Sequence, residues 1–246
     1  MIFSLIKLAT AILFTMIVSC GELLIIPFNR GGRLFHALAK FNSHGVLKIC
    51  GVRLQVLGLE HLDRGSSYIY VANHASYFDI PSVLAGIPDE TRIVYKKELE
   101  RIPIYGWGLR LGKTYIPIER KKGSEALQSL EEAAKKVREG SSVLLFAEGT
   151  RSLDGKLQPF KRGAFNLAVR AGVAVVPLTI LGSYRVMRKG SFRINPGMIT
   201  IIVGKPIASP GANGKTAEIQ LMEQVHAVIE KNYITDSSAA SDAKVD

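Results

Sequence analysis

Residues 68–79 read YIYVANHASYFD, an apolar, β-branched run that turns into a polar loop. The first part, YIYVAN at 68–73, has the composition of a buried strand. Pro81 favours the first turn of a helix, so we expect a helix to begin near Asp79. The stretch therefore predicts a strand, a loop that turns back on itself and a helix, with His74 and Asp79 separated by four residues.

The rest of the chain repeats this alternation of strand and helix. A clear amphipathic helix, GSEALQSLEEAAKKVR at 123–138, stops at Gly140, and residues 215–232 predict a closing helix. Further apolar runs typical of buried strands are VRLQVLG (52–58), RIVY (92–95), KTYIPI (113–118), SVLLFA (142–147), AVVPLTIL (174–181) and MITIIVG (198–204). This pattern predicts an α/β fold with a mixed, mostly parallel sheet flanked by helices over residues 51–234. Residues 235–246, TDSSAASDAKVD, predict a disordered tail.

Composition limits the class of protein. The chain has 246 residues, 47% of them hydrophobic, which is enough for one packed domain and excludes disorder along most of its length. A net charge of +11 accompanies a positive mean hydropathy of +0.17. Soluble proteins that bind nucleic acid usually dilute their hydrophobicity with charge, whereas a membrane surface rich in anionic lipid suits both properties. We therefore expect a membrane partner and no nucleic acid.

The N-terminus is strongly apolar. Residues 8–21, LATAILFTMIVSCG, carry no charge and lie between Lys7 and Glu22. This run of 14 residues is shorter than the roughly 20 that span a bilayer, which favours an interfacial or re-entrant helix. A tilted span over 1–28, with Lys7 and Glu22 reaching the interface, is the alternative. Ile17–Cys20 also resembles a lipoprotein cleavage box, although the next segment continues as an anchor rather than as a secreted start.

That next segment, GGRLFHALAKFNSHGVLKI at 31–49, predicts a basic amphipathic helix. Its apolar residues recur at helical spacing, and basic residues lie among them. Such a helix suits the plane of a membrane interface, and an ordinary core helix with a solvated basic face is the alternative. Together with the apolar start, it predicts that residues 1–50 form hydrophobic and amphipathic membrane-anchoring helices.

The first candidate for chemistry is the pair His74 and Asp79. A carboxylate on one imidazole nitrogen fixes the tautomer and stabilises the imidazolium, which leaves the other nitrogen free to take a proton from a hydroxyl. The pair is thus the base half of a Ser-His-Asp arrangement without a protein nucleophile. The alternative is that Asp79 caps the helix, with Ser76 completing a capping box, and that His74 is an ordinary loop histidine.

The second candidate, FAEGTRS at 146–152, also leaves an apolar strand. Arg151 offers a planar bidentate donor for phosphate, Gly149 lets backbone amides approach an anion, and Thr150 supplies a hydroxyl. Glu148 does not help an anion site by its charge, so we expect it to orient an arginine or the turn. The alternative is an ordinary turn with a surface ion pair.

Two basic positions can add to such an anion site. Lys161 lies in FKRGAF at 160–165, near the start of a predicted helix, where an anion is stabilised. Arg120 follows the strand KTYIPI directly as part of a basic run. Either position is equally consistent with a solvated surface charge.

Four blocks in order, NHASYFD, YIPIER, FAEGTRS and VVPLTI, with FKRGAF between the last two, resemble the glycerolipid acyltransferase family. The resemblance covers roughly residues 50–210, and the order of the blocks is more specific than any one of them. The second block departs from the family pattern, because Pro117 and Ile118 are two additional residues before Arg120.

The resemblance implies an enzyme of phospholipid biosynthesis with the His-x4-Asp motif. His74, held by Asp79, would deprotonate the sn-2 hydroxyl of 1-acyl-glycerol-3-phosphate, and that oxygen would attack the thioester of acyl-CoA or acyl carrier protein. The acceptor phosphate would be bound by Arg120, Glu148, Gly149, Thr150, Arg151 and Lys161. We expect no metal and no cofactor apart from the acyl donor. The expected location is the inner membrane, with the site on its cytoplasmic side.

Two alternatives remain at this stage. The same fold could acylate another lysolipid, such as a lyso-aminolipid or lysophosphatidylglycerol, because arginines select phosphate and not the headgroup. A non-enzymatic basic lipid-binding protein would account for the charge and the amphipathic N-terminus. It would leave the His-Asp block and its pairing with EGTR unexplained. A hydrolase is disfavoured because no Gly-x-Ser-x-Gly elbow appears.

Overall fold

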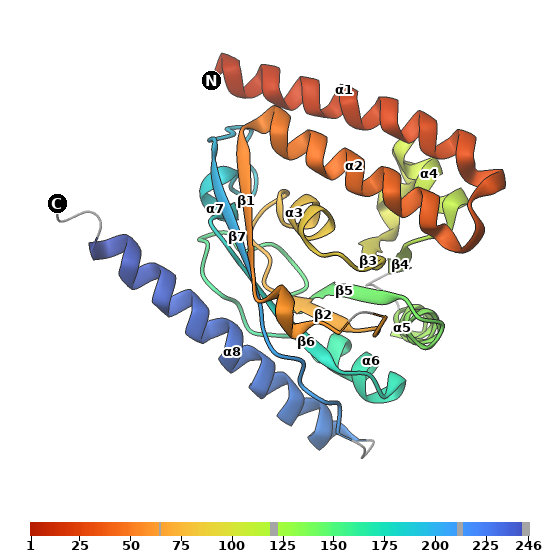
Figure 1. Cartoon of the computed structure of the whole chain (residues 1–246), viewed down its shortest axis with the longest axis vertical. Coiled ribbons are helices and arrows are strands. Elements are labelled where there is room, and N and C mark those ends of the chain that lie inside the picture. The colour runs from red at the N-terminus through yellow and green to blue at the C-terminus, as the bar shows by residue number, and fades with distance from the viewer. Residues whose placement is uncertain (64, 119–122, 211–213, 243–246) are drawn as a thin grey trace.

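The chain forms an α/β fold around one seven-stranded sheet (Figure 1). The computed structural model describes residues 1–63, 65–118, 123–210 and 214–242. The strand order is β1-β7-β6-β2-β5-β3-β4, and every neighbouring pair is parallel except β6 and β7. The strands are β1 (Val52–Leu57), β2 (Ile69–Ala72), β3 (Thr91–Lys96), β4 (Ile116–Ile118), β5 (Ser142–Phe146), β6 (Val175–Leu181) and β7 (Gly197–Val203). The predicted mixed, mostly parallel sheet flanked by helices is confirmed.

Each predicted apolar run overlaps one of these strands. The largest difference is β4, predicted from residue 113 and observed only from Ile116. Lys113 ends the preceding helix with a positive φ of 48°, so the chain turns before it becomes extended. The edge strand is short for that reason.

The central strand β2 is buried on both faces. Ile69 and Val71 belong to the core beneath α5 (Gly123–Arg138), α6 (Gly163–Ala171) and α8 (Lys215–Asp242), whereas Tyr70 and Ala72 belong to the core beneath α2 (Arg33–Cys50) and α3 (Asp79–Gly86). Two cores of this kind require apolar residues at every position of the strand, which is why the run YIYVA shows no alternation.

The helices divide between the two faces of the sheet (Figure 1). The segments α2 and α3 lie on one face, with α1 outside α2, and α5, α6 and α8 lie on the other. The bounds are α1 (Ile2–Ile25), α2 (Arg33–Cys50), α3 (Asp79–Gly86), α4 (Tyr105–Gly112), α5 (Gly123–Arg138), α6 (Gly163–Ala171), α7 (Ser183–Val186) and α8 (Lys215–Asp242).

The first helix presents its apolar side chains outward. Apart from Val18, its buried residues are small or polar, namely Ser4, Ala11, Ser19 and Glu22. Large apolar side chains are exposed, among them Phe3 at 81%. This is the reverse of a helix in a water-soluble protein, whose apolar stripe faces the core. The outer face of α1 is therefore suited to an apolar environment.

The helix is longer than its uncharged run suggests. It includes both Lys7, whose Nζ donates to the Cys50 carbonyl at 3.2 Å, and Glu22, which is buried against α4. Its 24 residues extend about 36 Å, and the stretch Ile2–Phe28 is long and apolar enough to cross a membrane. In the fold it lies lengthwise along α2, as Figure 1 shows.

The second helix joins this outer layer to the sheet. Its buried residues Phe35, Ala39 and Leu47 belong to the same core as β2 and β7, so α2 packs onto the sheet while α1 packs on α2. The buried Arg92 of β3 donates to the carbonyls of Gly31 and Gly32, where the chain turns between α1 and α2. Both glycines have positive φ, which accommodates the sharp turn.

The last helix continues beyond the predicted closing helix at 215–232. It reaches Asp242, so the structure places helix over much of the stretch predicted to be a disordered tail. Alanines in SSAASDA favour propagation of an existing helix. Residues 243–246 lie outside the described residues.

Candidate active site

The two sequence blocks meet at the carboxyl end of the sheet. Strands β2 and β5 are parallel neighbours, and Ala72 pairs with Phe146, so the residues that follow each strand emerge side by side. The Ser152 N–H donates to the His74 carbonyl at 2.8 Å, and the Ala147 N–H donates to the Ala72 carbonyl at 3.3 Å. The fold thus brings the His74 and Arg151 loops together.

Asp79 holds His74 as the spacing predicts. The His74 Nδ1 lies 2.7 Å from the Asp79 Oδ2, and the same oxygen accepts from the Ala75 and Ser76 N–H groups, both at 2.8 Å. The carboxylate is fully buried, whereas the His74 side chain keeps 16% of its surface exposed. With Nδ1 bound, the ring presents Nε2 as its remaining nitrogen.

The alternative role for Asp79 as a helix cap is wrong. Helix α3 begins at Asp79 itself, its N-cap position is Phe78, and no side chain caps it. The carboxylate points back to the loop that precedes it. The Ser76 hydroxyl donates instead to the Met187 carbonyl and accepts from the Phe78 N–H.

Two neighbours of His74 that the sequence did not single out hold the loop in place. The Asn73 side chain makes two hydrogen bonds to the Ile180 backbone: its amide nitrogen donates to the Ile180 carbonyl, and its oxygen accepts from the Ile180 N–H. The Phe146 ring stacks on the imidazole with centroids 4.0 Å apart. Their positions in the sequence could have indicated them as candidates, because Asn73 directly follows β2 and Phe146 is the last residue of β5.

Glu148 joins the two loops. Its Oε1 accepts from the His74 N–H at 3.0 Å, while its Oε2 is buried without a partner among the described residues. Burial raises the pKa of Glu148 from 4.5 to about 7, and nearby Asp79 adds to that rise, although backbone N–H groups oppose it. Glu148 was predicted to orient an arginine or its own turn, whereas its observed contact is to the backbone of the His74 loop.

Gly149 and Lys161 lie against each other. Gly149 has a φ of 75°, and a Cβ added to it would come within 2.9 Å of the Lys161 Nζ. The Lys161 N–H donates to the Ala147 carbonyl at 2.8 Å, which brings the start of α6 to the loop. Lys161 and Thr150 are both exposed, so both can reach an anion at this edge.

Arg151 is directed toward the His74 loop. Its guanidinium lies 3.4 Å from the centroid of the Tyr77 ring. The Arg151 Nη1 is buried without a hydrogen-bond partner, and within the described ranges no carboxylate pairs with it. The alternative of a surface ion pair is therefore not what the structure has. Arg120, predicted to join the same site, lies outside the described residues.

These groups can support proton transfer beside an anion site. An imidazole on a buried carboxylate can accept a proton from a hydroxyl. An arginine donor without a partner, in the loop next to that imidazole, can bind phosphate. Over the described part of the chain, no three His, Cys, Asp or Glu side chains come together as metal ligands.

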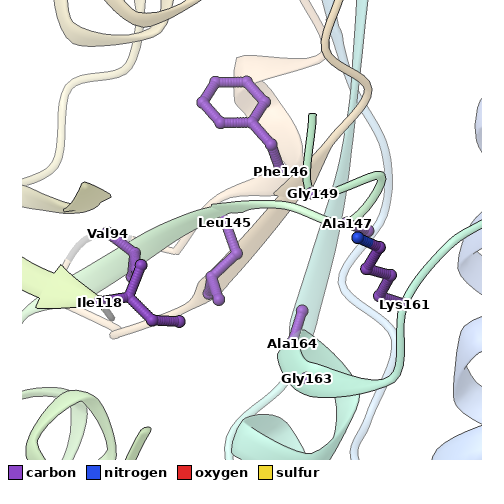
Figure 2. A pocket seen from close by; sticks show the side chains of 9 residues that line it. All are labelled: Val94, Ile118, Leu145, Phe146, Ala147, Gly149, Lys161, Gly163 and Ala164. Carbon is purple, nitrogen blue, oxygen red and sulfur yellow. The ribbon is translucent and has the colours of Figure 1, made fainter. Parts of the chain in front are cut away.

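A cavity of about 280 Å³ lies on the face of β5 opposite to the one that carries the Phe146 ring (Figure 2). Leu145, Ile118 and Ala164 contribute apolar side chains, and Lys161 lies at one side. Figure 2 shows the Phe146 ring pointing away from these residues, toward the face on which it stacks with His74. The cavity and the imidazole are thus separated by the strand.

Comparison with known proteins places these features in context. A family model described as Acyltransferase matches residues 53–181. The chain is 32% identical over 207 residues to a chloroplastic 1-acyl-sn-glycerol-3-phosphate acyltransferase of Brassica napus, covering 83% of this chain and 60% of that protein. It is 37% identical over 163 residues to a 1-acyl-sn-glycerol-3-phosphate acyltransferase of Limnanthes douglasii, covering 66% of this chain and 57% of the relative.

A solved structure is similar over nearly its whole length. The crystal structure of the 1-acyl-sn-glycerophosphate acyltransferase PlsC from Thermotoga maritima matches with a TM-score of 0.69 and 26% identity. The match covers 92% of this chain and 95% of that one. By contrast, the chain spans less than two thirds of the length of the plant relatives.

Proposed function

The chain belongs to the Acyltransferase family, and from that premise we propose that it transfers a fatty acyl group to the sn-2 hydroxyl of 1-acyl-glycerol-3-phosphate, giving phosphatidic acid. The donor in this proposal is acyl-CoA or acyl carrier protein. One observation carries it: His74 is bonded to a buried carboxylate while the unpartnered Arg151 Nη1 lies in the adjoining loop. A base for the hydroxyl and a donor for the phosphate thus lie on loops that follow neighbouring strands.

The reaction in this proposal is a direct transfer. The His74 Nε2 takes the proton of the acceptor hydroxyl as its oxygen attacks the thioester carbonyl. The tetrahedral intermediate then collapses: the carbon–sulfur bond breaks, and the sulfur takes the proton that His74 returns, so that the donor leaves as the free thiol. Asp79 stabilises the imidazolium between these steps, because its charge lies 2.7 Å from Nδ1. No covalent acyl-enzyme forms.

The acceptor phosphate is bound at the Arg151 loop in this account. The Arg151 Nη1 donates to a phosphate oxygen, Thr150 and Lys161 add donors from the exposed edge, and Gly149 leaves space for the approach. Glu148 acts as a positioning residue through its bond to the His74 N–H. Arg120 is included on its sequence alone.

The membrane part of the proposal rests on α1. Its outward face is apolar and its two charged residues are turned into the protein, so the helix can lie in the bilayer interface while α2 and α4 pack behind it. The helices α1 and α2 cover the same face of the sheet to which the His74 and Phe146 rings belong. A lysolipid in that interface would approach the site from the apolar side.

A panel of acceptors and donors tests this function. The wild-type chain and His74→Ala are given labelled acyl-CoA or acyl carrier protein with lysophosphatidate, lysophosphatidylglycerol or monoacylglycerol. We expect labelled phosphatidic acid from the wild type and a roughly 10³- to 10⁴-fold lower rate from His74→Ala. Membrane association should survive in the variant.

Each departure from this result has a definite meaning. Transfer to another lysolipid without transfer to lysophosphatidate would replace the acceptor in the proposal. Unchanged turnover by His74→Ala, with the circular dichroism of the wild type, would remove His74 as the base. Deletion of residues 1–28 tests the anchor, and full membrane retention of the truncated chain would assign anchoring to other surfaces.

A further inference from the structure

The net positive charge of the chain is concentrated in one stretch of the sequence, because that stretch has no acidic residues. No Asp or Glu occurs between Asp154 and Glu218. Within that stretch, the connection from β6 to β7 reads SYRVMRKGSFRINP at 183–196 and carries four basic residues. We call residues 184–193 of this connection the basic loop.

Two of these basic residues, Arg188 and Arg193, are turned outward, and their contacts are to uncharged groups. Arg188 and Arg193 are exposed, and their partners are uncharged: the Tyr184 ring, 5.3 Å from Arg188, and the Asn195 oxygen, 3.2 Å from Arg193. Over the described ranges, neither arginine forms an ion pair. Between them in the sequence, the Phe192 ring is 70% exposed.

The basic loop lies beside the apolar end of α1. The Ser4 hydroxyl donates to the Ile194 carbonyl at 3.3 Å, directly after the loop. Around Ser4, the helix exposes Ile2 at 73% and Phe3. Figure 1 shows α7, where the loop begins, below the N-terminal end of α1. Exposed basic, aromatic and aliphatic side chains therefore adjoin at one surface.

The basic loop is also bonded to both loops of the site. The Met187 carbonyl accepts from the Ser76 hydroxyl at 2.8 Å, and the Lys189 Nζ donates to the Arg151 carbonyl at 3.0 Å. The Tyr184 hydroxyl donates to the Leu153 carbonyl at 3.1 Å. Anything that holds the basic loop at a surface thus fixes the position of the site relative to that surface.

We propose that the basic loop is a second membrane contact, in which Arg188 and Arg193 bind the phosphates of anionic phospholipids and Phe192 enters the interface. The proposal builds on the membrane association proposed above and is independent of the reaction. The basic loop would give the protein a preference for anionic bilayers, which the apolar face of α1 alone does not provide. A hollow of about 310 Å³, lined in part by Arg185, Asn195 and Thr200, adjoins the loop and has room for a headgroup.

A bilayer fits this surface better than an acidic carrier protein does. Charge alone suits either partner. The exposed Phe192 and the continuity with the exposed side chains of α1 favour a surface that is apolar inside and anionic outside, which describes a bilayer. Docking of an acidic acyl donor at the loop is the competing outcome of the test.

The experiment measures binding of the full chain to vesicles of phosphatidylcholine alone or mixed with phosphatidylglycerol, at low and high salt. Arg188→Gln/Arg193→Gln is compared with Lys205→Gln/Lys215→Gln, which removes the same charge from exposed sites beyond the other end of β7. We expect the loop variant to bind mixed vesicles roughly 25-fold more weakly at low salt, from about fivefold per charge. The difference should shrink at high salt, and binding to phosphatidylcholine alone should not change.

Phe192→Ser supplies a second measurement. Loss of the ring should weaken binding to both kinds of vesicle, because its contribution does not depend on lipid charge. Circular dichroism and transfer to a dispersed short-chain lysophosphatidate show that the variants are folded.

Three outcomes would overturn the proposal. One is an equal loss in the loop and control variants, which would indicate net charge rather than a site. Another is unchanged vesicle binding with a lower kcat/KM only for acyl carrier protein, which would assign the loop to the donor. The third is failure of the wild-type chain to bind mixed vesicles. Wild-type chain that binds selectively but transfers no acyl group would refute the proposed reaction and leave this inference standing.

Discussion

The His74 loop (residues 73–79) and the Arg151 loop (residues 147–152) leave neighbouring parallel strands, yet they are held in different ways. The first loop is held by hydrogen bonds: one buried oxygen of Asp79 accepts three within the loop, and the Asn73 side chain makes two to the Ile180 backbone. The second exposes Thr150 and leaves a buried Arg151 donor without a partner. The difference indicates that folding alone orients the proposed base, whereas the proposed anion site keeps an unpartnered donor for its ligand.

The largest effect that separates the two loops is expected at Asp79. Asp79→Asn keeps the shape of the side chain and removes the charge that stabilises the imidazolium. We expect kcat to fall roughly 10²- to 10⁴-fold with little change in the KM for lysophosphatidate. Asp154→Asn is the matched control, because that exposed carboxylate bonds only within the neighbouring turn. Equal losses in both variants would contradict a special role for Asp79.

Glu148 tests the junction between the loops through the pH dependence of stability. Its folded pKa of about 7 lies above the ordinary 4.5, so its contribution to stability is fully present below about pH 4.5 and is lost as the pH rises through 7. Relative to Glu148→Gln, which does not titrate, the wild type should lose up to about 3 kcal/mol over that range. Thermal or urea unfolding of both proteins from pH 4 to 8 measures the difference. Parallel curves would show that Glu148 titrates normally.

Arg151 should affect binding more than turnover. Arg151→Lys retains the charge but loses the planar fork, and we expect kcat/KM for lysophosphatidate to fall roughly 10- to 100-fold, mostly through KM. Transfer to monoacylglycerol, which lacks the phosphate, should not change. Arg162→Gln is the control, since that exposed arginine pairs with Glu218. Equal losses with both acceptors would contradict phosphate binding by Arg151.

The smallest effect is expected at Tyr77, whose ring lies under the guanidinium. Tyr77→Leu should raise the KM for lysophosphatidate a few-fold, because a half-exposed cation–π contact contributes about 1 kcal/mol. Tyr77→Phe retains the ring and should behave as the wild type. A defect in the phenylalanine variant would assign the effect to the hydroxyl instead.

The contact between His74 and Asp79 was the most predictable feature of the site. Pro81 predicted a helix that begins near Asp79, and in the structure the helix begins at Asp79 and the carboxylate is turned back toward His74. The resemblance read from the four blocks is confirmed by the family model over residues 53–181. The roles assigned to the site residues remain predictions.

Other features depend on contacts between distant segments and could not be predicted. The stacking of Tyr77 on Arg151 follows from the register of β2 against β5, which no local pattern specifies. The length of the N-terminal helix was underestimated because Lys7 and Glu22 interrupt the uncharged run. In the fold, Lys7 donates a hydrogen bond to the Cys50 carbonyl, and Glu22 is buried. Which face of that helix is exposed depends on how α2 and α4 pack against it.

Direct transfer from thioester to lysolipid, with His74 as the base, is the central claim. The decisive measurement mixes the wild-type chain with labelled acyl donor, first without and then with 1-acyl-glycerol-3-phosphate, and follows the label on the protein and in the lipid. We predict no label on the protein in either case and rapid appearance of labelled phosphatidic acid once the acceptor is added. A stoichiometric acyl-enzyme that forms with donor alone and then passes its label to the acceptor would contradict the account.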